Sequence, residues 1–172
     1  MTASVRIEHT RNRHSRAVLQ QDTIVIRLAR NLSYPEERRH IESLVRRMVT
    51  MLKKDRSRRT VDPFFPLFDG QAQEIERLVH HINARTLNVP IGHIRLKPMK
   101  TQWGSCSSRG HITLNTALLK VPHHLLEYVI IHELAHRLVK NHSKRFWDLV
   151  ESVCPGAREA RKELRDYRIA RS

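Results

Sequence analysis

Residues 123–139 read HHLLEYVIIHELAHRLV, and this stretch decides the interpretation of the chain. Its apolar side chains occupy most of the helical circumference rather than one stripe, which predicts a helix buried inside a domain. The same helix contains His132, Glu133 and His136, three polar groups whose burial is costly unless a partner satisfies them. The segment therefore predicts the centre of the core and the functional site together.

The spacing within this helix is typical of a zinc site. His132 and His136 are four residues apart, so their side chains lie about 40° apart on one helical face and reach a single ion. Glu133 lies beside the first ligand, where its carboxylate can accept a proton from metal-bound water. In the alternative interpretation the two histidines are hydrogen-bonded core residues.

A catalytic zinc site requires a third protein ligand, and His142 is the nearest candidate. A continuous helix would turn His142 about 120° away from His136, so the helix must end before residue 142. Asn141 tolerates a left-handed conformation, and we expect it to turn the chain back. Two carboxylates remain as alternative third ligands: Glu127 and Glu151.

The N-terminal part of the chain shows a different pattern. Residues 4–9, 16–20 and 23–28 alternate apolar and polar side chains, which predicts strands, the last two forming a hairpin with a turn at Gln21–Asp22. A 3.6-residue period then predicts an amphipathic helix over 34–54. Prolines and phenylalanines in VDPFFPLFDG (61–70) mark a boundary. The predicted organisation is a hairpin-and-helix unit at 1–60 and a catalytic core at 61–172, or else one compact domain.

Further elements are expected around the buried helix. Helical patterns cover 71–87, 143–153 and 157–170, and the alternating segments 91–97 and 110–115 are interpreted as an antiparallel pair of strands. The predicted fold class is α+β, with a mostly antiparallel sheet packed on the metal-binding helix.

Composition excludes several classes of protein. The chain has 172 residues and only five glycines, which excludes a dinucleotide fingerprint and a phosphate-binding P-loop. A run of 18 apolar residues and a secretory signal are both missing from the sequence, so we expect a cytoplasmic protein without membrane contact. Cys106 and Cys154 are expected to be thiols. The net charge of +15 makes nucleic acid a possible partner, although a solvated basic surface explains the charge equally well.

Two blocks of sequence carry a specific resemblance. TQWGSCSSRGHITLN (101–115) and YVIIHELAHRLVKNHSKRFWDLV (128–150) resemble the YgjP-like zinc-dependent hydrolases, relatives of the SprT-type zincins. Residues 1–60 are less distinctive. The resemblance implies a zincin-like core with one Zn²⁺ per chain on His132, His136 and His142, and with Glu133 as general base.

The resemblance also implies that the Trp-Gly-Ser segment borders the active-site cleft. Candidate substrate-binding residues are Trp103, Gly104, His111 and Arg145, the last three as stabilisers of an oxyanion. By analogy with zincins, the strand ending at Asn115 is expected to be a sheet edge on which an extended peptide pairs.

The function predicted from these features is that of a zinc metallopeptidase, in which Glu133 activates a zinc-bound water for attack on a peptide carbonyl. Two alternatives stay open. The resemblance also allows a zinc-dependent nucleotide pyrophosphatase, and the basic surface allows a protease that DNA recruits to bound proteins.

Overall fold

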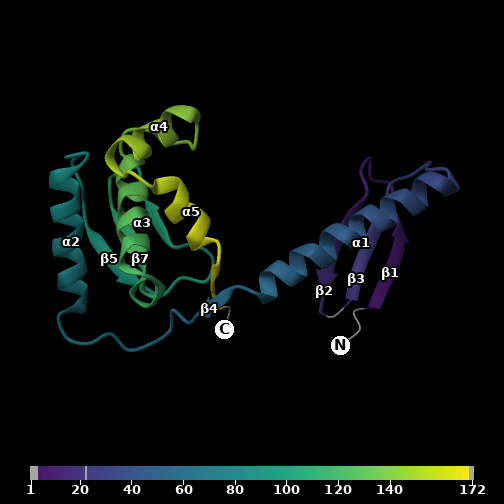
Figure 1. Ribbon diagram of the computed structural model, residues 1–172, viewed down its shortest axis with the longest axis horizontal. Coiled ribbons are helices and arrows are strands. Elements are labelled where there is room, and N and C mark those ends of the chain that lie inside the picture. The colour runs from purple at the N-terminus through teal and green to yellow at the C-terminus, as the bar shows by residue number, and fades with distance from the viewer. Residues whose placement is uncertain (1–3, 22, 171–172) are drawn as a thin grey trace. The chain divides into compact units, whose positions relative to one another are not determined.

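The computed structural model describes residues 4–21 and 23–170. The chain divides into two compact units, residues 1–57 (unit 1) and 58–172 (unit 2). Within the described ranges five α-helices combine with three small sheets, so the predicted α+β class is confirmed (Figure 1). Residues 58–60, which the sequence assigns to the N-terminal part, belong to unit 2 because the strand at Arg59–Val61 pairs with a strand near the C-terminus.

Unit 1 is a three-stranded sheet covered by one long helix. The strands are β1 (Ser4–His9), β2 (Arg16–Gln20) and β3 (Thr23–Leu28), in the order β1-β3-β2. β2 and β3 form the predicted antiparallel hairpin, and β1 pairs with β3 in parallel. Gln21 has a φ of 52°, which fits a tight turn. Asp22, the other predicted turn residue, lies outside the described residues.

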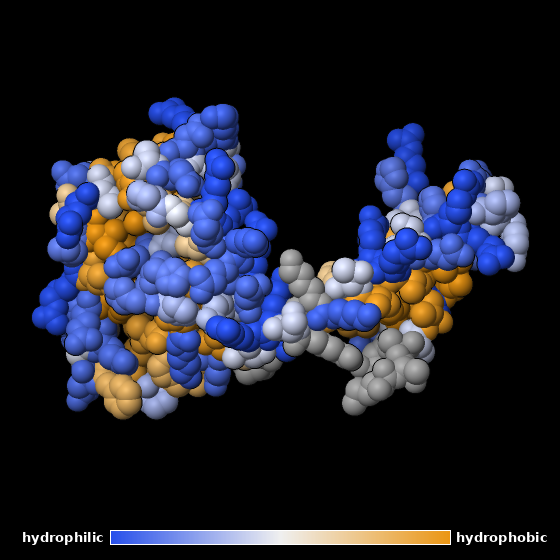
Figure 2. Space-filling view, in the orientation of Figure 1, coloured by the Kyte–Doolittle hydropathy of each residue, from blue (hydrophilic) through white to orange (hydrophobic). Residues whose placement is uncertain are grey.

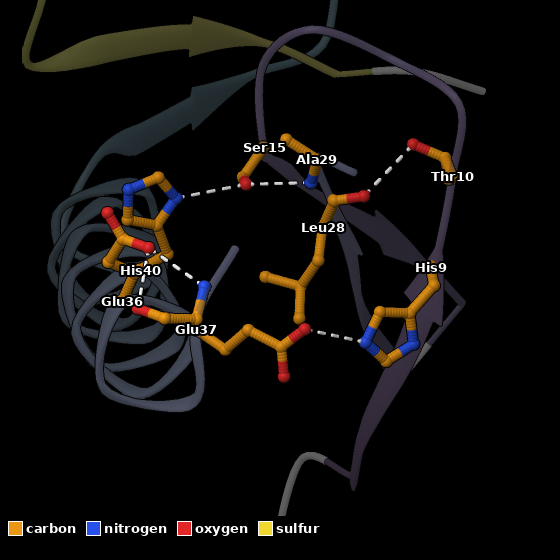
Figure 3. Close-up of polar contacts among 9 residues, drawn as sticks. His9, Thr10, Ser15, Leu28, Ala29, Glu36, Glu37 and His40 are labelled. Carbon is orange, nitrogen blue, oxygen red and sulfur yellow. Dashed lines mark hydrogen bonds and ion pairs between the residues drawn. The ribbon is translucent and has the colours of Figure 1, made fainter. Parts of the chain in front are cut away.

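Helix α1 (Tyr34–Arg56) packs one face on this sheet. Leu44 and Met48 contact an apolar row on β3 that consists of Ile24, Ile26 and Leu28. Polar contacts fix the first turns of the helix against the sheet (Figure 3). The His9 ring lies 3.0 Å from a carboxylate oxygen of Glu37, and Ser15 Oγ accepts a hydrogen bond from the Ala29 amide while lying 3.0 Å from the His40 ring.

Unit 2 is built around helix α3. Its elements in chain order are β4 (Arg59–Val61), α2 (Gln71–Arg85), β5 (Ile94–Lys97), β6 (Gly104–Cys106), β7 (Ile112–Asn115), the 3₁₀ helix η1 (Thr116–Lys120), α3 (His123–Ala135), α4 (Lys144–Val153), α5 (Ala157–Leu164) and β8 (Tyr167–Ile169). Nine of the thirteen residues of α3 are buried, because α2, α4, α5 and the β5-β7-β6 sheet all contact it. The prediction of a buried central helix is confirmed.

The sheet of unit 2 corrects two predictions. β5 pairs with β7 in parallel, and only the β6–β7 pair is antiparallel. The expected antiparallel pairing of 91–97 with 110–115 is therefore wrong, as is the mostly antiparallel sheet, because β6 forms in the intervening segment and reverses the chain once more. β7 lies between β5 and β6, so the strand that ends at Asn115 is central and offers no free edge.

The C-terminal helix is also shorter than predicted. α5 ends at Leu164, and residues 167–169 form β8, which pairs in parallel with β4. Tyr167 is buried there, and its hydroxyl accepts a hydrogen bond from Arg59. The pairing with a distant strand replaces the helical pattern of the isolated sequence.

Some apolar surface stays exposed on unit 1, where Figure 2 shows a continuous orange patch. The large apolar side chains of this unit that remain more than a third exposed, in addition to Tyr34, are Val5, Ile7, Leu19, Val49 and Met51. None of the helices in the described ranges has the length and hydrophobicity needed to cross a lipid bilayer.

Candidate metal centre

Three histidine side chains converge at the C-terminal end of α3. One nitrogen from each of His132, His136 and His142 lies within 4.8 Å of the others, and the Nε2 atoms of His132 and His142 are 3.0 Å apart. Tetrahedral zinc with Zn–N distances of 2.0–2.1 Å separates its ligand atoms by about 3.4 Å. The histidine nitrogens are therefore spaced closely enough for one small cation.

His142 reaches the group because the helix ends early. α3 stops at Ala135, and the amides of Leu138 and Val139 both bond back to its carbonyl. Asn141 is not among the described residues with positive φ, so the expectation that a left-handed Asn141 turns the chain is wrong. The return is instead anchored by the Trp147 indole, whose Nε1 donates to the His142 carbonyl at 3.1 Å.

A backbone carbonyl orients the second histidine. His136 Nδ1 lies 3.1 Å from the oxygen of Val139, and a carbonyl can only accept, so Nδ1 carries the proton. The lone pair of His136 is then on Nε2. Such a bond on the far ring nitrogen is the usual way in which proteins orient a metal-binding imidazole.

His132 is the most deeply placed of the three. Burial is the main cause that lowers its pKa to about 3, with the nearby His136 and His142 adding to the effect. The ring is therefore neutral at pH 7, which is the form that binds a metal. Its Nδ1 is buried and has no hydrogen-bond partner within the described part of the chain.

The Phe146 ring packs against the imidazole rings of all three histidines. It is fully buried, and its ring centroid lies 4.9 Å from that of His132, 4.6 Å from His136 and 4.8 Å from His142. Phe146 therefore belongs to the core of unit 2 and packs beneath the histidine group. Three imidazoles pressed against one phenyl ring have little room to choose other rotamers.

Glu133 is buried beside the histidines. Only 6% of its surface is exposed, and burial raises its pKa to about 7. The carboxylate lies against Gly104 of β6: a Cβ atom on Gly104 would fall 2.7 Å from Glu133 Oε1 and 2.8 Å from its Cγ. Glycine at this position is therefore what allows the carboxylate to occupy its place.

The other candidate substrate-binding residues lie in different surroundings. Trp103 is half-buried against the core of unit 2. His111 stacks on His93 with centroids 5.1 Å apart, and its Nδ1 accepts from the His93 amide. Arg145 is exposed in the first turn of α4. Of the four candidates, Gly104 is the one in direct contact with Glu133.

The alternative ligands are engaged elsewhere. Glu127 lies 3.3 Å from His123, and Glu151 lies 3.7 Å from Arg158. Both cysteines are free thiols, and burial raises the pKa of Cys106. In the described ranges the one cluster of potential metal ligands is the group of three histidines. Three imidazole nitrogens packed on a buried phenyl ring, with a carboxylate adjacent, fit a zinc ion well.

A match to a family model assigns this chain to a family, and two solved structures show a partial likeness. A family of metallopeptidase domains described as YgjP-like matches residues 66–167, which include the three histidines and Glu133. Among solved structures, the metallopeptidase zymogen abylysin of Pyrococcus abyssi is 30% identical with a TM-score of 0.49, over 56% of this chain and 99% of that chain. The zymogen jannalysin of Methanocaldococcus jannaschii is 28% identical with a TM-score of 0.45, over 52% and 92%. None of the curated protein sequences matches this chain.

Proposed function

Because the chain belongs to the YgjP-like metallopeptidase family and is therefore a hydrolase, we propose that it is a zinc-dependent peptidase whose catalytic machinery lies within residues 61–172. The observation that carries this proposal is the convergence of three histidine nitrogens beside a buried carboxylate. The proposed substrate is a peptide or an unfolded protein segment.

His132, His136 and His142 would hold the zinc ion. Bound there, zinc would polarise a carbonyl oxygen and lower the pKa of a water molecule. The Val139 carbonyl orients the His136 ring for this role. The Trp147 indole positions His142 by donating a hydrogen bond to its backbone carbonyl. Phe146 restricts the three rings to their places.

Glu133 is the proposed general base. A carboxylate accepts a proton most effectively when its pKa lies near the working pH, and burial raises the pKa of Glu133 to about 7. The protonated acid then donates its proton to the leaving amine of the substrate, so that the carboxylate is regenerated after each cycle. Gly104 keeps the carboxylate in reach by presenting no side chain to it.

The test uses the full chain loaded with zinc. The wild-type protein should cleave an unfolded protein substrate, and Glu133→Gln should keep the metal and lose about 10³-fold in kcat/KM. Glu127→Gln, a change of the same kind on the same helix, is the matched control and should retain activity. Nucleoside triphosphates are tested as substrates in a separate assay. Hydrolysis of the nucleotides without cleavage of the protein substrate would identify a pyrophosphatase instead of a peptidase. An active Glu133→Gln enzyme would contradict the assignment of the base.

A further inference from the structure

A cavity lies close to the histidine group, between α4 and α5, the last two helices in Figure 1. It has a volume of about 430 Å³, within the range of small-molecule sites. We call it the cationic pocket, because four of its seven lining residues are basic and only one is acidic. The lining consists of Trp147, Glu151, Ala157, Arg158, Arg161, Lys162 and Arg165.

The basic residues lie along α5, with Arg165 directly after its last residue. They occupy positions 158, 161, 162 and 165, a spacing of three and four residues that brings like charges together on a helix. The helix dipole favours cations in the last turn, but it disfavours Arg158 in the first. Repulsion between these like charges opposes their clustering in the free protein, and a bound anion would reduce that repulsion.

Few carboxylates compensate these charges. Arg158 lies 3.7 Å from Glu151, with most of its side chain exposed. For Arg161, Lys162 and Arg165 the described residues contain no carboxylate within ion-pairing distance. Glu163, on the same helix, bonds to His124 instead. The charges of these three groups are thus not neutralised by an ion pair within the described ranges.

Trp147 connects this pocket to the histidine group. The Arg161 guanidinium lies 3.9 Å from the centre of the indole ring. The same ring stacks on His142, with centroids 5.5 Å apart, and lies 5.8 Å from His132. The two groups are thus separated by the width of one indole ring, a distance that a few residues of an extended peptide span at about 3.3 Å per residue.

We propose that the cationic pocket is a substrate subsite that binds a carboxylate side chain, aspartate or glutamate, close to the bond that is cleaved. This inference rests on the peptidase function proposed above. Guanidinium groups bind carboxylates through paired, charge-assisted hydrogen bonds, and an ammonium group adds a third donor. Arg161 covers the Trp147 ring, which disfavours nucleic acid because single strands stack their bases on free aromatic faces.

Binding is measured separately from cleavage, so that the two proposals fail independently. The zinc-loaded, full-length Glu133→Gln protein is titrated with a labelled glutamate-rich peptide and with its glutamine twin, at low salt, by fluorescence anisotropy. The glutamate peptide should bind about 10- to 100-fold more tightly, as expected for charge-assisted hydrogen bonds. Lys162→Glu should abolish most of this preference, and Arg165→Glu repeats the test one turn further along.

The matched control is Arg77→Glu, which reverses an equally exposed charge on α2. It should keep the preference. Equal binding of the two peptides, or an equal loss in Lys162→Glu and Arg77→Glu, overturns the subsite. A thymidine oligonucleotide whose binding falls in Lys162→Glu, while peptide binding stays unchanged, overturns it in favour of nucleic acid. Selective binding of the acidic peptide without any cleavage by the wild-type protein supports the pocket and overturns the peptidase function.

Discussion

The two units follow the same strand plan but differ in the helix that covers it. In unit 1 the order is β1-β3-β2 and in unit 2 it is β5-β7-β6; in each, the last strand in sequence is central, pairing in parallel with the first and antiparallel with the second. α1 has one buried face and a cationic outer face, whereas most of α3 is buried. The sheet plan alone therefore does not produce a site.

What distinguishes α3 is the layer of elements around it. α2, α4 and α5 cover the sides of α3 that would otherwise face water, and this burial raises the pKa of Glu133 and keeps His132 neutral. No helix in the described part of unit 1 covers α1 in this way. The comparison indicates that the pKa shifts of these titratable groups arise from the second layer of packing rather than from the sheet.

The largest effect on stability is expected when one core side chain is truncated in each unit. Phe146→Ala removes the fully buried ring beneath the three histidines and should cost about 3–5 kcal/mol in free energy of unfolding, together with a loss of zinc affinity. Met48→Ala in unit 1 should cost about 2–4 kcal/mol and leave zinc binding unchanged. Denaturant titration and a competitive zinc chelator measure the two quantities. Equal loss of zinc affinity in both variants would show that the phenyl ring has no special relation to the histidines.

A smaller effect is expected at β6, whose counterpart in unit 1, β2, contains no glycine. Gly104→Ala places a Cβ atom 2.7 Å from Glu133 Oε1, so the carboxylate must move. A displacement of this size should lower kcat/KM about 10- to 100-fold while zinc stays bound.

The control for this variant is Gly70→Ala. Unlike Gly104, Gly70 has a positive φ, and a Cβ atom there meets nothing within 4 Å, so the change strains the backbone without touching the site. It should lower stability by about 1 kcal/mol and leave specific activity intact. Full activity in Gly104→Ala would mean that the position of the carboxylate is not set by this contact.

The smallest effect concerns the start of α1. The Glu36 carboxylate accepts hydrogen bonds from the Ser33 hydroxyl and amide, which lower its pKa, whereas α3 begins without a side-chain cap. The contribution of Glu36 to stability is therefore present above its ordinary pKa of 4.5 and disappears as the pH falls through the lower folded value. The thermal midpoint of Glu36→Gln should lie slightly below that of wild type at pH 7, and this gap should close in acid. If the difference in thermal midpoint grows as the pH falls, the direction assigned to the pKa shift of Glu36 is wrong.

Sequence patterns predicted part of the fold and left the rest undetermined for physical reasons. The apolar side chains around most of the helical circumference of residues 123–139 predicted a buried helix, since one element contains the whole signal. The alternation in β5 and β7 predicted strands but not their direction, because parallel and antiparallel strands share the same period. Likewise, Tyr167 and Ile169 fit a helical pattern locally and form a strand only because β4 is available as a partner.

Sequence patterns likewise predicted one part of the candidate site and left another part undetermined. The spacing of His132 and His136 follows from helical geometry, and the structure brings them together with His142. The contact of Gly104 with Glu133 had no local signal, since the two residues lie far apart in the sequence. The contact of the Val139 carbonyl with His136 was not predictable either, because every residue has a backbone carbonyl and the residue pattern does not indicate which one is used.

The most direct test of the account is the zinc content of the purified protein, compared between His142→Ala and His111→Ala. Both variants remove an imidazole from unit 2, but His142 belongs to the converging group and His111 to the stacked pair with His93. We expect about one zinc per chain in the wild type and in His111→Ala, and a large loss in His142→Ala. Zinc that stays fully bound in His142→Ala, or that is missing from the wild type at saturating metal, would contradict the three-histidine centre.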